Sequence, residues 1–186
     1  MFACEQEQVS PDFLCLAKGL TGGYLPLAAT LTTESIFEGF LNQNDGVDRT
    51  FYYGHSYCGN QVGCAVANAS LEIFEGESVL EKLVGKIAIL EEALAKISES
   101  PFVRDVRRCG FVAAVELGAA NGESFPQEVR TGAAVCKNAL KHGLLTRPIL
   151  DSIVLMPPLC IADEQIIRMG EALLASITEC CSSVGD

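Results

Sequence analysis

The stretch FLCLAKGLTGGYLPLAATLTT, residues 13–33, is the most informative part of this sequence. Two apolar runs, Phe13–Leu16 and Leu27–Thr32, are bounded by turn residues and predict two short buried strands. The glycines and the proline between these runs predict a compact, irregular loop. Lys18 lies where the first run meets the loop, so the stretch predicts a strand–loop–strand unit that presents a single lysine.

The segments on either side of this unit differ in their structural signals. Met1–Asp12 carries no helix or strand signal of its own. Helices are expected over Gln61–Phe74 and Ser78–Ile97, and apolar residues in the second recur close to the 3.6-residue period. The rest of the chain predicts strand, strand, helix, strand, strand and helix, at Phe102–Arg108, Phe111–Leu117, Gln127–Lys141, Leu144–Arg147, Ser152–Met156 and Asp163–Ser182. This order predicts a small α+β layer structure.

Composition narrows the class of partner. The chain has 186 residues, 49% of them hydrophobic, which is typical of a globular protein. Its formal net charge of −11 disfavours binding to nucleic acids and anionic membranes, because both would be repelled. A small-molecule partner is therefore expected. The sequence has neither a secretory signal nor an apolar run long enough for a membrane span, so a cytoplasmic location is expected.

The nine cysteines are scattered and form no CxxC pair. With an odd number of cysteines and two histidines, this spacing argues against both a zinc site and a disulfide framework. Most of the cysteines lie in apolar runs and are expected to be small buried hydrophobic residues in a reducing compartment.

Lys18 is the lysine best placed for covalent chemistry. It is the only lysine in the first 81 residues, and it stands between an apolar run and a glycine-rich loop that lets a ligand approach the backbone. A lysine partly withdrawn from water becomes a neutral amine that can attack a carbonyl carbon. The alternative is an ordinary lysine at a strand end that extends into solvent.

Two further segments could bind anions. The segment GHSYCGN, residues 54–60, offers the Ser56 hydroxyl and a run of backbone N–H groups before a helix. Arg147 is followed by Pro148 at the end of an expected strand, which suits bidentate binding of a carboxylate. A capped loop and a surface arginine remain the alternatives. Asp151 is expected to be a turn residue.

Three segments carry a resemblance to a known family. FACEQEQVSPDFLCLAKGLTGGYLPLAATLTT (2–33), FYYGHSYCGNQVGCAVANASLEIF (51–74) and GLLTRPILDSIVLMPPL (143–159) resemble, in this order, the class III aminotransferases of the fold-type-I pyridoxal-phosphate enzymes. The resemblance implies an α/β fold in two parts. Residues 1–72 would form the end of the large cofactor domain, and residues 73–186 the small α+β C-terminal domain.

The resemblance also implies roles for five residues and a cofactor, pyridoxal 5'-phosphate. Lys18 matches the lysine that binds the cofactor aldehyde and then moves a proton during catalysis. His55 and Ser56 match positions that contact the cofactor phosphate across a subunit boundary, which implies a homodimer with shared active sites. Gly54 matches a residue of the substrate pocket, and Arg147 matches the arginine that binds the substrate carboxylate.

Within this class, the motifs are most similar to the branch that serves biotin synthesis. That branch implies S-adenosylmethionine as amino donor and 8-amino-7-oxononanoate as acceptor. The alternative is the ω-amino acid:pyruvate branch, which shares Lys18 and Arg147. Val154 departs from the biotin branch, some members of which have a tyrosine near the substrate at this position.

The family's chains are more than twice as long, and the aspartate that pairs with the pyridine nitrogen would lie before Met1. We therefore expect this polypeptide to be poorly active by itself and to need a missing N-terminal half. A second hypothesis is a non-catalytic fragment that complements an N-terminal half made separately.

Overall fold

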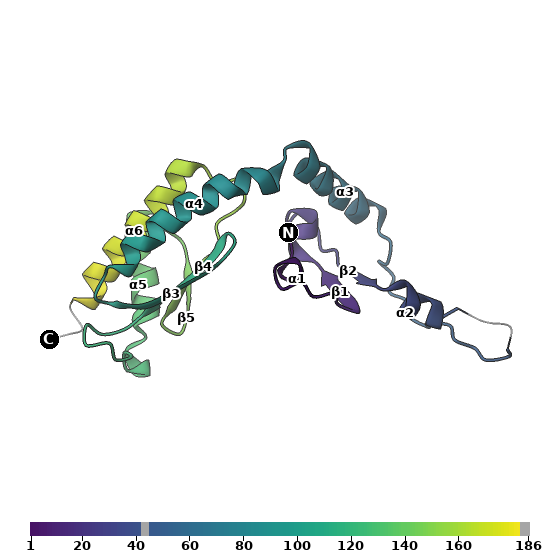
Figure 1. The fold of residues 1–186 in the computed structure, drawn as a ribbon, viewed down its shortest axis with the longest axis horizontal. Coiled ribbons are helices and arrows are strands. Elements are labelled where there is room, and N and C mark those ends of the chain that lie inside the picture. The colour runs from purple at the N-terminus through teal and green to yellow at the C-terminus, as the bar shows by residue number, and fades with distance from the viewer. Residues whose placement is uncertain (42–44, 183–186) are drawn as a thin grey trace. The chain divides into compact units, whose positions relative to one another are not determined.

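The protein divides into two compact units, Met1–Leu80 and Glu81–Asp186. The structure is a computed structural model that describes residues 1–41 and 45–182; Figure 1 labels the helices and strands. Residue 72, at the domain boundary implied by the resemblance, lies inside the continuous helix α3 (Gln61–Gly76). The division at residues 72 and 73 remains a proposal.

The first unit is built around a two-stranded antiparallel ribbon. Strand β1 pairs with β2 in a register that runs from Phe13 opposite Thr32 to Leu16 opposite Ala29, and helix α3 packs against the 3-10 turn η1. A short helix, α1, forms where the sequence predicted no element. The elements are α1 (Ala3–Gln6), β1 (Phe13–Leu16), η1 (Lys18–Thr21), β2 (Ala29–Thr32), α2 (Glu34–Gly39) and α3 (Gln61–Gly76).

The two strands of this ribbon are predicted correctly in type, but the prediction that they are buried is wrong. Strand β1 alternates between exposed and half-buried side chains, and every residue of β2 is exposed. The reason is that the ribbon has no third strand within the described part of the chain. Among the described residues of this unit, the buried ones are Thr21, Gly63 and Ala67.

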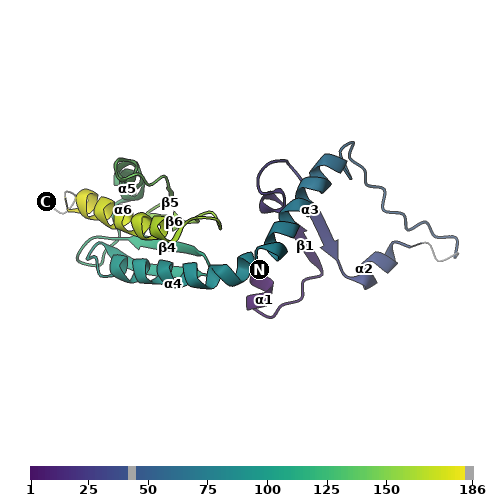
Figure 2. The same cartoon turned by 90° about the horizontal axis from the view of Figure 1, so that it is seen from above.

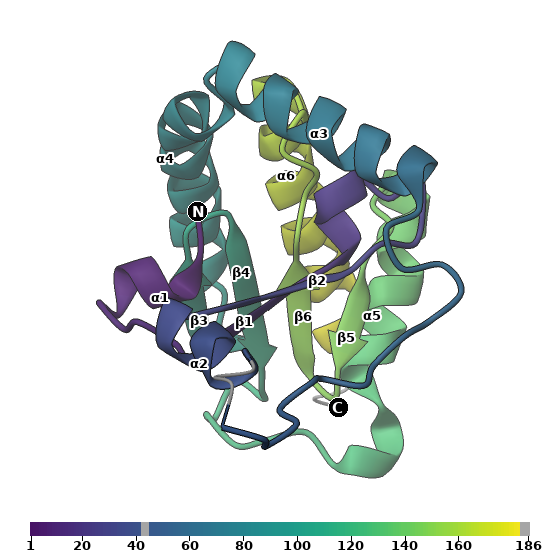
Figure 3. The same cartoon turned by 90° about the vertical axis from the view of Figure 1, so that its right-hand side faces the viewer.

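The second unit has a four-stranded antiparallel sheet in the order β3-β4-β6-β5. Figure 2 shows helices α4 and α6 side by side along one face of this sheet, and Figure 3 shows the strands in front of them with α5 next to β5. The elements are α4 (Val79–Ser98), β3 (Val103–Cys109), β4 (Val112–Leu117), η2 (Gln127–Val129), α5 (Thr131–Ala139), η3 (Leu140–His142), β5 (Arg147–Ile149), β6 (Ser152–Leu155) and α6 (Asp163–Cys181).

The hydrophobic core of the second unit lies between the sheet and these helices. Helix α4 buries Leu83, Leu90, Leu94 and Ile97, which share one helical face, and alternate residues of β4 point into the same core. Gly170 lets α6 approach α4 closely, because a Cβ atom there would lie 2.7 Å from the Ala93 Cβ. No helix within residues 1–41 and 45–182 is both long and apolar enough to cross a lipid bilayer.

Two predicted elements of this unit have different bounds. The helix expected over Gln127–Lys141 is interrupted at Arg130, whose φ of 52° is left-handed, so α5 begins at Thr131. The strand expected over Leu144–Arg147 is wrong in position, because ladder pairing begins at Arg147 and continues to Ile149. The bounds of β5 are set by its pairing with β6, and the hydrophobicity of the local sequence does not reveal this pairing.

The prediction that most cysteines are buried is wrong. All nine are free thiols, five are exposed and two, Cys136 and Cys181, are buried. The exposed ones lie in the thinly covered first unit or, like Cys109 and Cys160, at turns. Burial raises the pKa of the Cys136 thiol to about 11, and the pKa of the Cys181 thiol likewise to about 11.

These thiols give a prediction for native-state alkylation. Iodoacetamide at pH 8 should modify Cys109 and Cys160 and leave Cys136 and Cys181 intact, because alkylation requires an accessible thiolate. Mass spectrometry of tryptic peptides would measure this, with urea-unfolded chain as the control in which all four react. Rapid modification of Cys136 in the folded chain would contradict the described core.

The same shifts predict a loss of stability in alkali. Folding raises both pKa values from 9.0 to about 11, so the folded state favours the neutral thiols. This contribution to the free energy of unfolding is fully present below about pH 9 and is lost as the pH rises through about 11. Urea unfolding of the wild-type chain and of Cys136→Ala should show a steeper alkaline loss in the wild type.

Candidate active site

Lys18 begins the 3-10 turn η1 directly after strand β1. Its φ of 52° is left-handed, which is uncommon for a residue other than glycine. The side chain is exposed in this chain, so the expectation that it is partly withdrawn from water is not met. Strained backbone of this kind tends to occur at functional positions, and it sets the direction in which the lysine leaves the loop.

The loop around Lys18 forms an open hollow of about 930 Å³. Lys18 contributes the one amine, and the remaining lining is glycine, alanine, proline, leucine and the ring of Tyr24, with no acidic side chain. A hollow of this size and apolar character can take a small aromatic molecule. Its lining therefore suits a cofactor ring attached through the lysine, but it offers no carboxylate partner for a ring nitrogen.

The loop at residues 54–60 leads into α3 and is exposed throughout. The backbone N–H groups of Cys58 and Asn60 donate to the carbonyl oxygens of His55 and Tyr57, and the Tyr57 N–H donates to the His55 ring. Asn60 caps α3 by accepting from the Gly63 N–H at 2.9 Å. The expected run of free N–H donors is thus partly used up inside the loop.

The Ser56 hydroxyl remains available in this loop. It makes no hydrogen bond within residues 1–41 and 45–182 and its side chain is exposed, so it can donate to an anion. Gly54, three residues after Phe51, has open space where a Cβ would stand. The loop precedes α3, which packs against the turn that carries Lys18, so the two predicted cofactor segments belong to the same unit.

Arg147 lies in the second unit and is the first residue of β5, whereas the sequence placed it at a strand end. Arg147 is the first residue in a row of cross-strand partners that crosses the sheet. Val154 pairs with Arg147 on one side and with Ala114 on the other, and Ala114 pairs in turn with Arg107. Cross-strand partners share one face of a sheet. Because Ile153 and Leu155 are buried on the opposite face, this row stands on the face that α4 and α6 do not cover.

The hairpin that carries Arg147 is held at several points. The Thr146 hydroxyl donates to the Val154 carbonyl oxygen at 2.5 Å, and the Asp151 carboxylate accepts from the Gly132 N–H at 2.8 Å. The Leu117 N–H donates to the Asp151 carbonyl oxygen at 2.9 Å. Asp151 therefore has a second role besides the expected one in its own turn. Its carboxylate caps α5, which is distant from it in sequence. Sequence reasoning missed this because no local motif links residues 19 positions apart.

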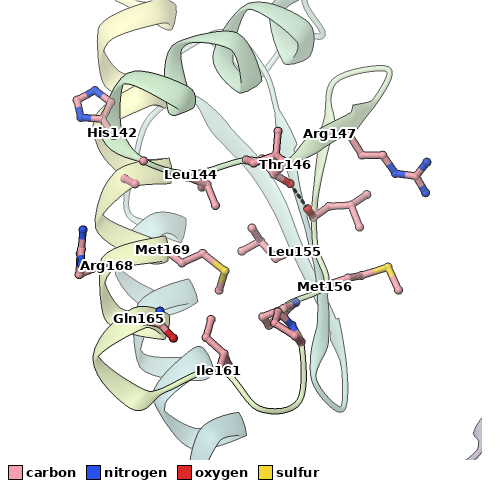
Figure 4. A pocket seen from close by; sticks show the side chains of 16 residues that line it. His142, Leu144, Thr146, Arg147, Leu155, Met156, Ile161, Gln165, Arg168 and Met169 are labelled. Carbon is pink, nitrogen blue, oxygen red and sulfur yellow. Dashed lines mark hydrogen bonds between the residues drawn. The ribbon is translucent and has the colours of Figure 1, made fainter. Parts of the chain in front are cut away.

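A hollow of about 640 Å³ lies between β5, β6 and α6. Figure 4 shows Leu144, Leu155, Ile161 and Met169 extending into it, while the guanidinium of Arg147 points away from it. The arginine is thus presented to the open face of the sheet rather than to this hollow.

Gly132 gives a stability prediction. A Cβ at this position would lie 2.3 Å from the Leu150 carbonyl oxygen, so Gly132→Ala should displace the turn and lower the free energy of unfolding by about 1–3 kcal/mol. Gly85→Ala is the matched control, because its Cβ would meet nothing within 4 Å and alanine favours the helix. Urea unfolding followed by circular dichroism would compare them; equal stabilities would contradict the described contact.

The chain matches the family model described as Aminotransferase class-III over residues 1–177. It is 49% identical over 181 residues to the adenosylmethionine-8-amino-7-oxononanoate aminotransferase of Aquifex aeolicus, covering 96% of this chain and 40% of the relative. The enzyme of the same name from Geobacter sulfurreducens is 46% identical over 179 residues, with 95% and 39% covered. The chain thus spans about two fifths of the length of these curated relatives.

Solved structures give the same grouping. The crystal structure of adenosylmethionine-8-amino-7-oxononanoate aminotransferase from Methanocaldococcus jannaschii superposes with a TM-score of 0.89 at 44% identity, covering 97% of this chain and 42% of that one. An amine transaminase from an uncultivated Pseudomonas species, in a PLP-bound form, superposes with a TM-score of 0.86 at 31% identity, covering 97% and 41%. The fold is that of the fold-type-I transaminases, and the chain belongs to the class-III aminotransferase family.

Proposed function

We propose that this chain is the lysine-bearing part of a pyridoxal-phosphate-dependent aminotransferase. The observation that carries the proposal is the 44–49% identity to aminotransferases of a single name over nearly the whole chain. It is joined by the placement of Lys18 as the single amine in a hollow of otherwise apolar and glycine lining.

The described residues fit the cofactor through three groups. Lys18 Nζ would hold it by bonding to the aldehyde carbon with loss of water, and Ser56 and His55 of a second copy of the chain would contact its phosphate. Bound pyridoxal phosphate supplies an electron sink that makes a substrate α-hydrogen acidic. The partner of the ring nitrogen has to come from outside the hollow, since no lining residue there is acidic.

Lys18 would also act as the acid–base group of the reaction. Once its amine is released by the incoming substrate amine, Nζ can take the proton at the donor's α-carbon. The glycines that follow leave open space around the lysine, so a substrate can approach it. Gly54 would leave similar room for substrate.

Arg147 would orient the substrate through its carboxylate. Its guanidinium is exposed on the uncovered face of the sheet and can donate two parallel hydrogen bonds. We propose that the working unit is a homodimer in which His55 and Ser56 serve the partner's cofactor. Sedimentation of the cofactor-bound protein would test this, and a monomer with full activity would contradict it.

The biotin-pathway reaction is favoured over the ω-amino acid:pyruvate alternative by sequence identity. Shape does not separate the two, because the structural superpositions onto transaminases of other names also reach TM-scores of 0.86–0.90. Those structures are 26–31% identical, against 44% for the Methanocaldococcus jannaschii protein. We propose S-adenosylmethionine as donor and 8-amino-7-oxononanoate as acceptor.

Cofactor attachment tests the core of the proposal. The chain would be mixed with pyridoxal phosphate, reduced with borohydride and digested, and the modified peptide mapped by mass spectrometry. The label is expected on Lys18, to be lost in Lys18→Ala and kept in the control Lys82→Ala. A label spread over the lysines of the second unit and absent from Lys18 would contradict it.

The donor is tested on a joined chain, made from the N-terminal part of the Aquifex aeolicus relative followed by residues 1–186 of this protein. Turnover of 8-amino-7-oxononanoate with S-adenosylmethionine is expected. Turnover only with an ω-amino acid as donor and pyruvate as acceptor would favour the alternative branch. Co-expression of the two parts as separate chains would then show whether residues 1–186 can complement an N-terminal half.

A further inference from the structure

Thr21 is one of three buried residues among the described part of a unit in which most side chains are exposed. It is 1% exposed, and its hydroxyl donates to the Leu25 carbonyl oxygen at 2.5 Å. A hydroxyl so buried has lost its water, and this hydrogen bond satisfies both it and the carbonyl. The contact closes a turn over residues 21–25, and this turn follows Lys18 by three residues.

The rest of this loop is held by backbone hydrogen bonds of local turns. The Gly22 N–H donates to the Gly19 carbonyl oxygen at 3.0 Å, and the Tyr24 N–H donates to the Thr21 carbonyl oxygen at 3.2 Å. Lys18 keeps a left-handed φ of 52° at the start of the loop. A residue other than glycine keeps such a conformation only where its surroundings fix it, so the loop needs an anchor.

Thr21 also lies where the loop meets α3. Its turn, η1, packs against α3, which buries Gly63 and Ala67. A Cβ at Gly63 would lie 3.5 Å from the side chain of Leu27, so the loop and the helix are in close contact there. The helix is capped by Asn60, the last residue of the predicted phosphate-contact loop.

We propose that Thr21 is a positioning residue, whose hydroxyl bond to Leu25 fixes the loop so that the Lys18 amine is presented at one place relative to α3 and the segment that precedes it. Thr21 acts through Lys18 and touches no substrate. What Lys18 then does rests on the proposed function, but the hydroxyl contact itself does not.

Two variants separate the hydroxyl from the packing. Thr21→Val keeps the shape and removes the donor, which leaves the carbonyl oxygen of the half-buried Leu25 without this partner. Thr21→Ser keeps the donor and removes the methyl group. Hydrogen exchange of the peptide spanning residues 19–25 in the 186-residue chain, without cofactor, reports the loop directly.

Thr21→Val is expected to speed exchange in this peptide about tenfold, and Thr21→Ser to stay within about threefold of the wild type. Peptides of the second unit serve as the internal control. The joined chain loaded with cofactor gives two further readouts. Thr21→Val should slow the attachment of cofactor to Lys18, as trapped with borohydride, and should shift the pH at which the absorbance of the bound cofactor changes. Thr21→Ser should keep both the attachment rate and this pH at the wild-type values.

The outcomes differ for the two proposals. Equal exchange in Thr21→Val and the wild type, or no protection of this peptide in the wild type, would overturn the role of the hydroxyl. A loss in Thr21→Ser as large as in Thr21→Val would assign the effect to packing and overturn it too. If exchange behaves as expected but no variant or wild-type protein attaches the cofactor at Lys18, the proposed function fails while the hydroxyl contact stands.

Discussion

Lys18→Ala in the joined chain is expected to lower the rate of amino transfer by at least about 10³-fold. The variant loses the amine that would bind the cofactor aldehyde and take the proton at the donor's α-carbon, and a positioned acid–base group alone contributes about 10²–10⁴-fold. Initial rates with S-adenosylmethionine and 8-amino-7-oxononanoate would measure the loss, with cofactor binding followed separately by absorbance.

Two controls make the Lys18 prediction specific. Lys18→Arg keeps the positive charge but not a nucleophilic amine, so it should be as inactive as Lys18→Ala. Methylamine added to Lys18→Ala should restore part of the rate, because a free amine can move the proton but is not held in place. Near-normal turnover by either variant would exclude Lys18 as the catalytic lysine.

Arg147→Ala in the joined chain is expected to raise the KM for a carboxylate-bearing substrate by about 10²–10³-fold, with a much smaller change in kcat. Two charge-assisted hydrogen bonds to the carboxylate would be lost, each worth about 1.5–3 kcal/mol. Steady-state kinetics over a range of substrate concentrations would separate the two constants.

The matched variants for Arg147 differ in geometry and location. Arg147→Lys keeps the charge but not the planar pair of donors, so its KM should lie between those of the wild type and Arg147→Ala. Arg168→Ala removes another arginine of the second unit, one on helix α6, and should change KM by less than about threefold. Equal effects of Arg147→Ala and Arg168→Ala would indicate a general charge effect instead of a specific carboxylate contact.

The elements with strong local periodicity were predicted best. The helix expected over Ser78–Ile97 is α4, Val79–Ser98, and the one expected over Asp163–Ser182 is α6, Asp163–Cys181. In both, the spacing of apolar residues follows the helical period over many turns. The strands expected over Phe102–Arg108 and Phe111–Leu117 are confirmed as the antiparallel hairpin of β3 and β4, where Gly110 takes the positive φ of 58° that the tight turn needs.

Predictions that depended on distant contacts were less accurate. The break at Arg130 and the start of β5 at Arg147 follow from packing against other elements. Asp151 was expected to serve its own turn, yet its carboxylate caps a helix that begins 20 residues earlier in the chain. Three of the four cysteines of the first unit are exposed because burial requires a covering layer, and hydrophobic sequence alone does not provide one.

The sequence by itself determined which chemical groups this protein can offer: one lysine beside a glycine-rich loop, a serine before a helix, and an arginine before a proline. These are local features, since composition and backbone preference act over a few residues. The tertiary structure alone decided that Arg147 stands on the face of the sheet that α4 and α6 do not cover and that Asp151 holds its hairpin. Each of these depends on contacts that form only when the elements pack together, and no short sequence window contains both partners of the register or of the cap.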